Sequence, residues 1–215
     1  MNILGLDASS QKSGYALFID GILEDYGVWE LTSDEEYDWR KRIAFMADSI
    51  SAYCEMHDVD VIYAEDVPPI SQNSQTVKVL SALQGMLIAL SVLHCTEIYF
   101  VPVKRWKQKI GINLVASKEN NDCKKRIKHH FGKDATKPLN KVKGWAKAYE
   151  KKFSVDYVND LFDLELVYKS PTSKYNQDDI ADAINIAWSE IGDVKPYDLR
   201  DFKDISDEFY DLVTT

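Results

Sequence analysis

The sequence predicts an α/β fold in which helices flank a mixed five-stranded sheet. Three runs of β-forming residues follow one another at the start of the chain, and two further β-rich runs then alternate with segments of helical periodicity. The chain has 215 residues, of which 45% are apolar and 12% aromatic. This composition can supply a substantial hydrophobic core, and it excludes a fibrous repeat or a wholly disordered chain.

The first three strands are expected to pair as an antiparallel meander. Residues 2–7 form a short apolar run that ends on an acid, and residues 14–19 and 22–31 are both rich in β-formers. Asp20 and Gly21 separate the last two runs, and Asp-Gly between such runs is a strong signal for a tight hairpin. The chain therefore opens with three neighbouring strands.

The next part of the chain alternates helix and strand. Residues 38–57 have apolar side chains at the spacing of an amphipathic helix, and residues 75–93 form a second, more apolar helix. Residues 59–64 and 97–101 read as short strands. Strands that are joined through helices run parallel, so we expect a mixed sheet that is covered by helices. A final helix is predicted at residues 176–191.

A strongly basic segment follows the fifth strand. Residues 104–152 contain 16 Lys and Arg against 4 acids, a local net charge of +12, and because the whole chain carries −9 the remainder carries −21. Two or three helices are expected here, with a break at Lys137-Pro138. Aromatic residues, Trp106 among them, lie between the cations, a mixture that suits contact with nucleic-acid phosphates and stacking on bases. A solvated lysine-rich surface is the simpler alternative.

Other features of the sequence bear on membrane association and cellular location. The longest apolar-looking stretch, residues 86–93, is far shorter than the roughly 18 residues that a bilayer helix needs, so no membrane partner is expected. The N-terminus has no positive flank and does not read as a signal peptide. Three widely spaced cysteines without a CxxC pair favour free thiols and a cytoplasmic location.

Four acids stand where they can form one cluster. Asp7 ends the first strand and Glu65 ends the fourth, and neighbouring strands that end on acids bring those acids to one edge of the sheet. Asp179 and Asp182 are three residues apart on the final helix, so they share a face and can point at the same edge.

Converging carboxylates repel one another unless cations neutralise them. Oxygen ligands without a nearby Cys or His cluster select Mg²⁺ or Mn²⁺ over Zn²⁺, and two such ions about 4 Å apart promote phosphodiester hydrolysis. The sequence therefore predicts a site for two Mg²⁺ ions, with Mn²⁺ as a substitute. Each acid taken alone is more simply a turn or helix-terminus charge, and Asp66 and Asp178 are adjacent competitors for a place in the cluster.

Four short motifs follow one another along residues 1–132 and 175–191. They are Gly5-Leu6-Asp7 with Gly14-Tyr15-Ala16, Ala64-Glu65-Asp66-Val67-Pro68, Tyr99-Phe100-Val101-Pro102 with Trp106-Lys107, and Asp179-Ile180-Ala181-Asp182-Ala183. This series resembles the RuvC family of Holliday junction resolvases, which belongs to the RNase H-like superfamily. Ala8-Ser9 stands where the common cellular form has Pro-Gly, and the departure suits a divergent phage or viral member.

The resemblance implies an RNase H-like, metal-dependent endodeoxyribonuclease that acts as a homodimer on four-way DNA junctions. The family's four metal-binding and catalytic acids match Asp7, Glu65, Asp179 and Asp182. By the same comparison residues 1–195 are one nuclease domain, in which residues from about 134 to 175 form a basic insertion before the last catalytic helix. Residues 196–215 are an acidic C-terminal extension.

The DNA-binding residues are expected in the basic segment. Lys107 and Lys118 fall near the family's DNA-contacting lysines. The full expected set is Lys104, Arg105, Lys107, Lys118, Lys124, Lys125, Arg126 and Lys128. The leading function is resolution of four-way junctions by paired phosphodiester hydrolysis. The alternatives are cleavage of RNA–DNA hybrids or of flap and branched DNA, and a non-catalytic DNA-binding role of the same fold. A phage-encoded protein of this kind would act in the host cytoplasm.

Overall fold

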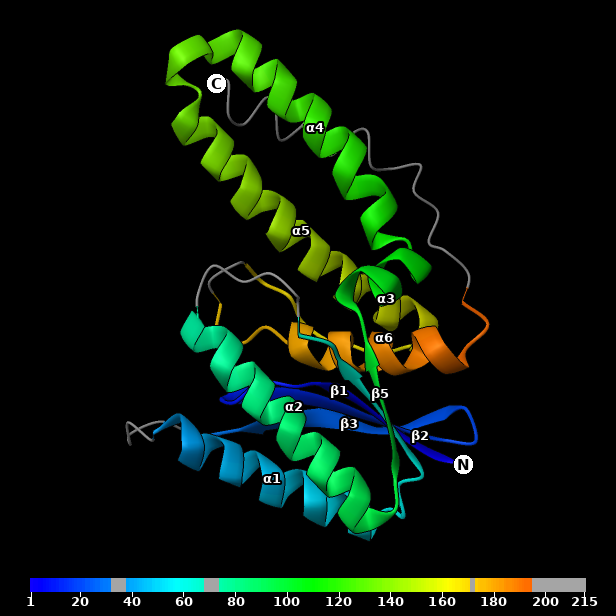
Figure 1. Ribbon diagram of the computed structural model, residues 1–215. Coiled ribbons are helices and arrows are strands. Elements are labelled where there is room, and N and C mark those ends of the chain that lie inside the picture. Colours follow the sequence, from blue (N-terminus) through cyan, green and yellow to red (C-terminus); the bar gives the residue numbers. More distant parts are fainter. Residues whose placement is uncertain (32–37, 68–73, 171–172, 195–215) are drawn as a thin grey trace. The chain divides into compact units, whose positions relative to one another are not determined.

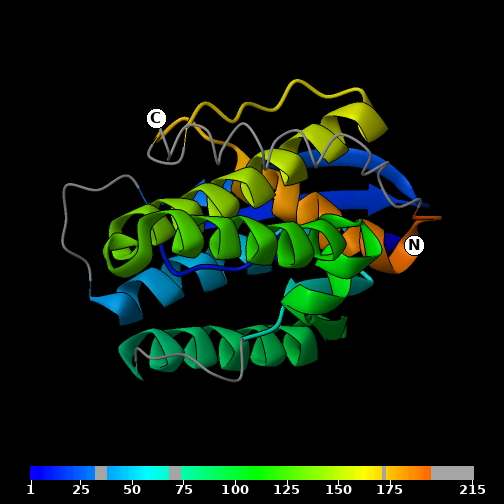
Figure 2. The same cartoon turned by 90° about the horizontal axis from the view of Figure 1, so that it is seen from above.

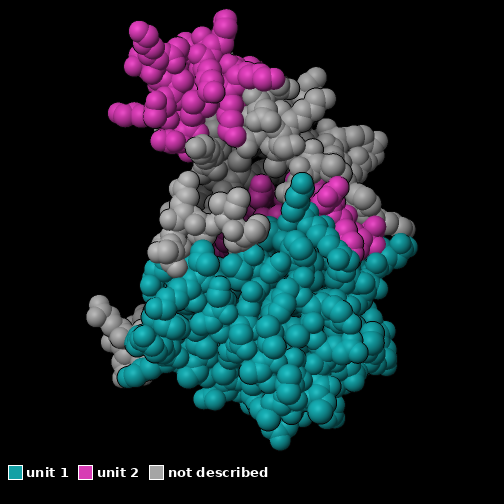
Figure 3. Space-filling model, in the orientation of Figure 1, with its two compact units in different colours: residues 1–106, 179–193 teal, residues 107–178, 194–215 magenta. Residues whose placement is uncertain are grey.

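The computed structural model describes residues 1–31, 38–67, 74–170 and 173–194, except for the side chains of residues 74, 113–122 and 141–149. The chain divides into two compact units, coloured separately in Figure 3. Among the described residues, the first unit contains residues 1–106 and 179–193, and the second contains residues 107–178. The acidic extension predicted at 196–215 lies outside the described residues, and the predicted insertion at 134–175 stays a prediction.

The first unit is built on the predicted mixed five-stranded sheet, whose strand order is β3-β2-β1-β4-β5 (Figure 1). Its strands are β1 (Asn2–Asp7), β2 (Lys12–Ile19), β3 (Ile22–Glu30), β4 (Val61–Glu65) and β5 (Glu97–Val101). The first three pair antiparallel, whereas β4 and β5 run parallel to β1. The fold class predicted from the sequence is therefore confirmed.

The predicted hairpin between β2 and β3 turns at the Asp-Gly pair. Asp20 and Gly21 both have positive φ, 51° and 84°. Such values at both central residues are typical of the tight turn whose twist matches that of paired strands. The backbone N–H of Asp20 also donates to the carbonyl of Met1 at 3.0 Å, which ties the turn to the start of β1.

Two helices cover one face of the sheet, and a third covers the other (Figures 1 and 2). On the first face lie α1 (Trp39–Met56) and α2 (Ser74–His94). Their buried side chains form one cluster with the inward residues of the strands: Leu4, Leu6, Leu17, Met46, Ile50, Cys54, Val59, Ile62, Ala64, Leu83, Leu87 and Leu90. The opposite face is covered by α6 (Asp178–Ile191).

Two glycines allow α6 to lie directly on the sheet. A Cβ atom at Gly5 would collide with the carbonyl of Ala183, and a Cβ atom at Gly14 would collide with the carbonyl of Asp179. The obstacles are backbone atoms, which cannot rotate away as a side chain can. The first turn of α6 is thereby fixed against the start of β2, and this contact places the acids of α6.

The second unit contains a helical hairpin. Figures 1 and 2 show α4 (Ile112–Phe131) and α5 (Thr136–Phe162) side by side, joined by the short 3₁₀ turn η1 (Gly132–Asp134). Cys123, Ile127 and Ala135 form its small buried cluster. A shorter helix, α3 (Val103–Lys109), crosses the boundary between the units.

The helix break predicted at Lys137-Pro138 lies later in the chain than the turn in the structure. The turn that separates α4 from α5 lies at Gly132–Asp134, and Pro138 belongs to the first turn of α5. Proline is tolerated there because the first backbone N–H groups of a helix have no intrahelical partner. After α5, Asn159 holds the chain that leads back to α6, since its side chain both donates to and accepts from the backbone of Leu166 at 2.9 Å.

One described helix is long and apolar enough to cross a membrane by length and composition alone. It spans Gln75–His94 with a mean hydropathy of 1.8, and 28% of it is buried. The prediction from the sequence rested on residues 86–93 alone and did not identify this helix as long enough to cross a membrane, because polar Ser81, Gln84 and Ser91 interrupt the apolar residues. Leu83, Leu87 and Leu90 of this helix pack on the sheet, whereas Ile88, Val92 and Leu93 are exposed.

Candidate functional site

The sheet brings Asp7 and Glu65 to the same edge and the same face. In the parallel pair of β1 and β4, Leu6 lies opposite Ala64, so the two acids occupy the next position on each strand. Leu6 and Ala64 both point into the core under α1 and α2. Because side chains alternate along a strand, Asp7 and Glu65 belong to the opposite face, the one that α6 covers.

The final helix adds Asp179 and Asp182 to this edge. Gly14 pairs with Asp7 across β1 and β2, and the carbonyl of Asp179 lies directly against Gly14. Asp182 follows three residues later and shares the face of Asp179. The structure therefore places Asp7, Glu65 and the backbone of Asp179 at one edge of the first unit, with Asp182 about one helical turn farther along α6. That the four acids form one site stays a prediction.

Two side chains outside that set contact the acids. The indole Nε1 of Trp106 donates to Glu65 Oε1 at 3.3 Å, and this tryptophan is fully buried. The Nζ of Lys12 lies 2.6 Å from Asp179 Oδ2, and about a quarter of each of these two side chains is exposed. Trp106 thus orients a carboxylate and is not available for stacking on bases, which corrects the expectation drawn from its basic neighbours.

The turn after β1 is held by serine side chains. The Ser13 hydroxyl donates to the carbonyl of Ser9 at 2.7 Å and accepts from the backbone N–H of Ser9 at 3.0 Å. The Ser9 hydroxyl in turn accepts from the N–H of Gln11 at 3.3 Å. These bonds close the turn with the residues Ala8-Ser9-Ser10, so a Pro-Gly pair is not needed there.

The two competing acids have partners elsewhere. Asp66 Oδ1 accepts a hydrogen bond of 3.0 Å from Gln84 Nε2 on α2, which is the face opposite to that of Glu65. Asp178 is buried and forms an ion pair with Lys151 within the second unit. Strand alternation explains the first case, and neighbouring helix positions diverge by about 100° in the second.

The donor set suits a hard divalent cation, although the side chains do not close around one. Among the described residues, no group of three or more His, Cys, Asp and Glu side chains is close enough to hold a metal ion. Four carboxylates from two strand ends and one helix nevertheless supply the oxygen ligands that Mg²⁺ and Mn²⁺ prefer. The backbone arrangement therefore fits such ions, and binding would draw the carboxylates together.

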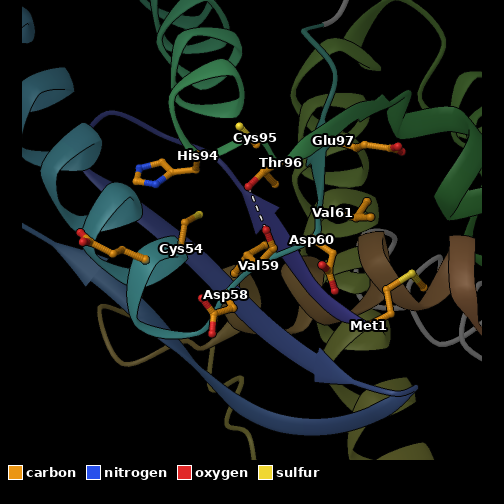
Figure 4. Close-up of a pocket in the computed structure, with 11 residues that line it drawn as sticks. Met1, Cys54, Asp58, Val59, Asp60, Val61, His94, Cys95, Thr96 and Glu97 are labelled. Carbon is orange, nitrogen blue, oxygen red and sulfur yellow. Dashed lines mark hydrogen bonds between the residues drawn. The ribbon is translucent and has the colours of Figure 1, made fainter.

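Two concave regions lie on the described part of the first unit. A pocket of about 30 Å³ lies beside Glu65 and is also lined by Asp66 and Gln84. A larger open depression, about 760 Å³, lies at the other end of the parallel strands, where His94, Cys95 and Asp58 line it (Figure 4).

The basic residues expected to bind DNA have different environments. Lys104, Lys125, Arg126 and Lys128 are exposed, whereas Lys124 is half-buried. Arg105 pairs with Glu190 at 2.6 Å, and Lys107 pairs with Glu150 at 3.2 Å. The side chain of Lys118 lies outside the described part of the structure. Exposed cations therefore run along the second half of α4, and their role in DNA binding stays a prediction.

Comparison with known proteins identifies the fold. No protein-family model matches the chain, and no curated protein sequence matches it. Among solved structures, it is similar to Thermus thermophilus RuvC in complex with a Holliday junction substrate, with 12% identity and a TM-score of 0.57 over 91% of this chain and 99% of that one. A second structure of Thermus thermophilus RuvC is similar at 14% identity and a TM-score of 0.52, covering 88% of this chain and 92% of that one.

This chain has a RuvC-like fold. The yeast mitochondrial Holliday junction resolvase Ydc2 is a further structural neighbour, with 16% identity and a TM-score of 0.49 over 96% of this chain and 83% of that one. The two Thermus thermophilus RuvC structures confirm, at the level of the fold, the resemblance drawn from four short motifs. A phage or viral source, also expected from the sequence, has no support among these neighbours and stays a prediction.

Two residues at the site escaped the sequence analysis. Lys12 sits in a polar turn where nothing marks a lysine as special, and its carboxylate partner is 167 positions away in the sequence. Trp106 was noticed, but its basic neighbours suggested exposure. The available signal was that a short helix on a sheet packs one face inward: Trp106 is buried, whereas Lys104 and Arg105 just before it are exposed.

Proposed function

We propose that this protein is a divalent-metal-dependent endonuclease that cleaves branched DNA, with the four-way junction as its substrate. The observation that carries the proposal is that β1 and β4 end on Asp7 and Glu65 at one edge of a RuvC-like sheet, where the first turn of α6 brings Asp179. The similar Thermus thermophilus RuvC was solved with a Holliday junction substrate, and this supports branched DNA as the ligand class.

In this proposal Asp7, Glu65, Asp179 and Asp182 would hold the metal ions. Such ions supply Lewis acidity that activates water and stabilises the oxygen that leaves the phosphate. Trp106 keeps Glu65 in place through its indole N–H, and the packing of α6 on Gly14 fixes Asp179 beside the end of β1. The protein thus contributes the ligands and their orientation, which is the usual contribution of a protein to metal-assisted hydrolysis.

The basic side chains of α4 are the proposed contacts to the DNA backbone. Lys125, Arg126 and Lys128 are exposed within a single turn of the same helix. Each phosphate that they neutralise releases condensed cations, so affinity for DNA should fall steeply as salt concentration rises. A protein with a net charge of −9 needs such a local concentration of cations to bind a polyanion.

We further propose that two copies of the chain act together, because paired cuts in a two-fold symmetric junction need two sites. The exposed face of α2 suits the contact between the copies. Ile88, Val92 and Leu93 on this helix are 49%, 75% and 68% exposed, although all three are large and apolar. Contiguous apolar surface of this kind marks interaction sites in globular proteins.

The interface is tested by replacing Val92 with Glu. The variant is expected to sediment as a monomer at concentrations where the unmodified protein is a dimer, since a charge would be buried without a partner. Ile22→Glu is the matched control, because Ile22 is a large apolar side chain that is 64% exposed on β3. An unmodified protein that stays monomeric, or that binds lipid vesicles through this helix, would contradict the proposed dimer.

The substrate is tested with a labelled four-way junction beside matched duplex, flap and RNA–DNA hybrid, each with Mg²⁺ and with a chelator. We expect symmetric nicks in the junction alone, and their loss with the chelator. Cleavage of the hybrid or the flap instead would support a catalytic role of the acids but would show that the junction is not the substrate. Tight binding without any cleavage would favour a non-catalytic DNA-binding protein.

A further inference from the structure

Lys12 places a positive charge at the acidic edge. It is the first residue of β2, two positions before Gly14, and therefore lies on the face that α6 covers. Its Nζ is 2.6 Å from Asp179 Oδ2. Only about a quarter of either side chain is exposed, so solvent screens this ion pair less than it screens a pair on the open surface.

The backbone of Lys12 is held firmly. It lies opposite Glu30 in the antiparallel pair of β2 and β3, and its N–H is 3.4 Å from the hydroxyl of Ser9. The neighbouring residue Gln11 accepts a hydrogen bond of 3.1 Å from Leu31. Because strand pairing fixes the Cα atom, the lysine side chain reaches Asp179 from a defined position rather than from a loose loop.

Glu30 is the other carboxylate that Lys12 faces across the strands. Residues paired across two strands project to the same face of the sheet, so Glu30 is the natural competitor for the ammonium group. Glu30 is exposed, whereas the ammonium group of Lys12 forms an ion pair with Asp179. The lysine charge is therefore directed at an acid of the site and not at its cross-strand neighbour.

We propose that Lys12 is a positioning residue that competes with a divalent cation for Asp179, so that metal must displace the ammonium group before this acid can act as a ligand. The inference rests on the proposed function, because it assumes that the four acids bind metal. An ammonium group neutralises the charge of one carboxylate, but unlike a metal ion it offers no coordination position for a further ligand. The pair with Lys12 therefore stabilises the metal-free site and lowers its affinity for metal.

The expected size of the effect follows from Coulomb's law. The attraction between an ammonium group and a carboxylate 2.6 Å apart, at the dielectric constant of water, corresponds to roughly tenfold in an equilibrium constant, and a metal ion must overcome it to take Asp179. Lys12→Met removes that charge and keeps an unbranched side chain of similar length. Mn²⁺ should then bind about tenfold more tightly, whereas Lys12→Arg, which keeps the charge, should bind Mn²⁺ within threefold of the unmodified protein.

The test is a titration of the full-length protein with Mn²⁺, followed by electron paramagnetic resonance of the free ion, at 0.1 M salt and without DNA. Glu30→Gln serves as a matched control, since it removes the neighbouring carboxylate and should leave the Mn²⁺ affinity within twofold. In an Asp179→Asn background, Lys12→Met should lose most of its effect. Thermal unfolding in chelator checks that each variant folds.

The outcomes separate this inference from the proposed substrate. Tighter Mn²⁺ binding by Lys12→Met supports the role of Lys12 even if no junction is cleaved, in which case only the proposed function fails. Unchanged or weaker Mn²⁺ binding by Lys12→Met overturns the inference, whether or not junctions are cleaved. An equal effect of Lys12→Met with and without Asp179 also overturns it, because the lysine would then act through another group.

Discussion

The packing of α6 on Gly14 gives the sharpest prediction about how the fold positions the acids. A Cβ atom at this position would overlap the carbonyl oxygen and carbon of Asp179 and would lie 3.0 Å from the backbone nitrogen of Ile180. These are all backbone atoms of the first turn of α6. The turn itself must move by about 1.5 Å, because the carbonyl oxygen would lie 1.9 Å from the Cβ atom and ordinary van der Waals contact begins at 3.4 Å. Gly14→Ala therefore tests the site through a residue that is not itself a ligand.

The expected loss of stability is about 1–3 kcal/mol, the usual cost of an overpacked contact in a core. Displacing catalytic groups by about 1 Å costs on the order of 100-fold in rate. We expect Gly14→Ala to unfold at lower urea concentration and to cleave the junction about 100-fold more slowly. Urea unfolding followed by circular dichroism and single-turnover cleavage measure the two effects.

Gly85→Ala is the matched control for this experiment. Gly85 lies in α2, and a Cβ atom there would have no neighbour within 4 Å. Alanine is favoured over glycine inside a helix by about 1 kcal/mol, so this variant should be as stable as the unmodified protein or slightly more stable. A Gly14→Ala protein that matches the unmodified protein in stability and cleavage would refute the packing argument.

Two further predictions concern Trp106 and Cys54. Trp106→Phe removes the hydrogen bond to Glu65 and should reduce Mn²⁺ affinity by about 10-fold or more, as expected for loss of a group that orients a ligand; an unchanged Mn²⁺ titration would contradict this. Burial raises the pKa of the Cys54 thiol to about 11 from 9.0, so the folded protein keeps this proton over a range where the unfolded chain loses it. Stability should therefore fall between about pH 9 and pH 11, and Cys54→Ala should flatten this part of the urea-unfolding profile; an equally steep profile would show that Cys54 is not responsible.

Much of the fold could be predicted because its signals are local. The Asp20-Gly21 pair marks a hairpin by the backbone angles that these two residues tolerate. The order of strands and helices followed from periodicity, and parallel pairing followed from the helices between the later strands. The spacing of Asp179 and Asp182 placed them on one helix face without any knowledge of their surroundings.

What could not be predicted depends on contacts between distant residues. The ion pair of Lys12 with Asp179 and the hydrogen bond of Trp106 with Glu65 both join segments that only the folded sheet brings together. Gly14 looked like part of a motif, but its role as the contact surface for α6 required the packing. The turn at Gly132–Asp134 was missed because a proline a few residues later is a stronger local signal than a glycine.

The central claim is that the acids at the edge of the sheet carry out cleavage. It is tested most directly by comparing Asp7→Asn with Asp66→Asn in single-turnover cleavage of a four-way junction with Mg²⁺, with junction binding measured in parallel. Both variants replace a carboxylate with an amide. Asp7 belongs to the proposed site, whereas Asp66 accepts a hydrogen bond from Gln84 on the other face of the sheet. We predict that Asp7→Asn binds the junction but does not cut it, whereas Asp66→Asn cuts at close to the unmodified rate. Cleavage that survives Asp7→Asn would contradict the account.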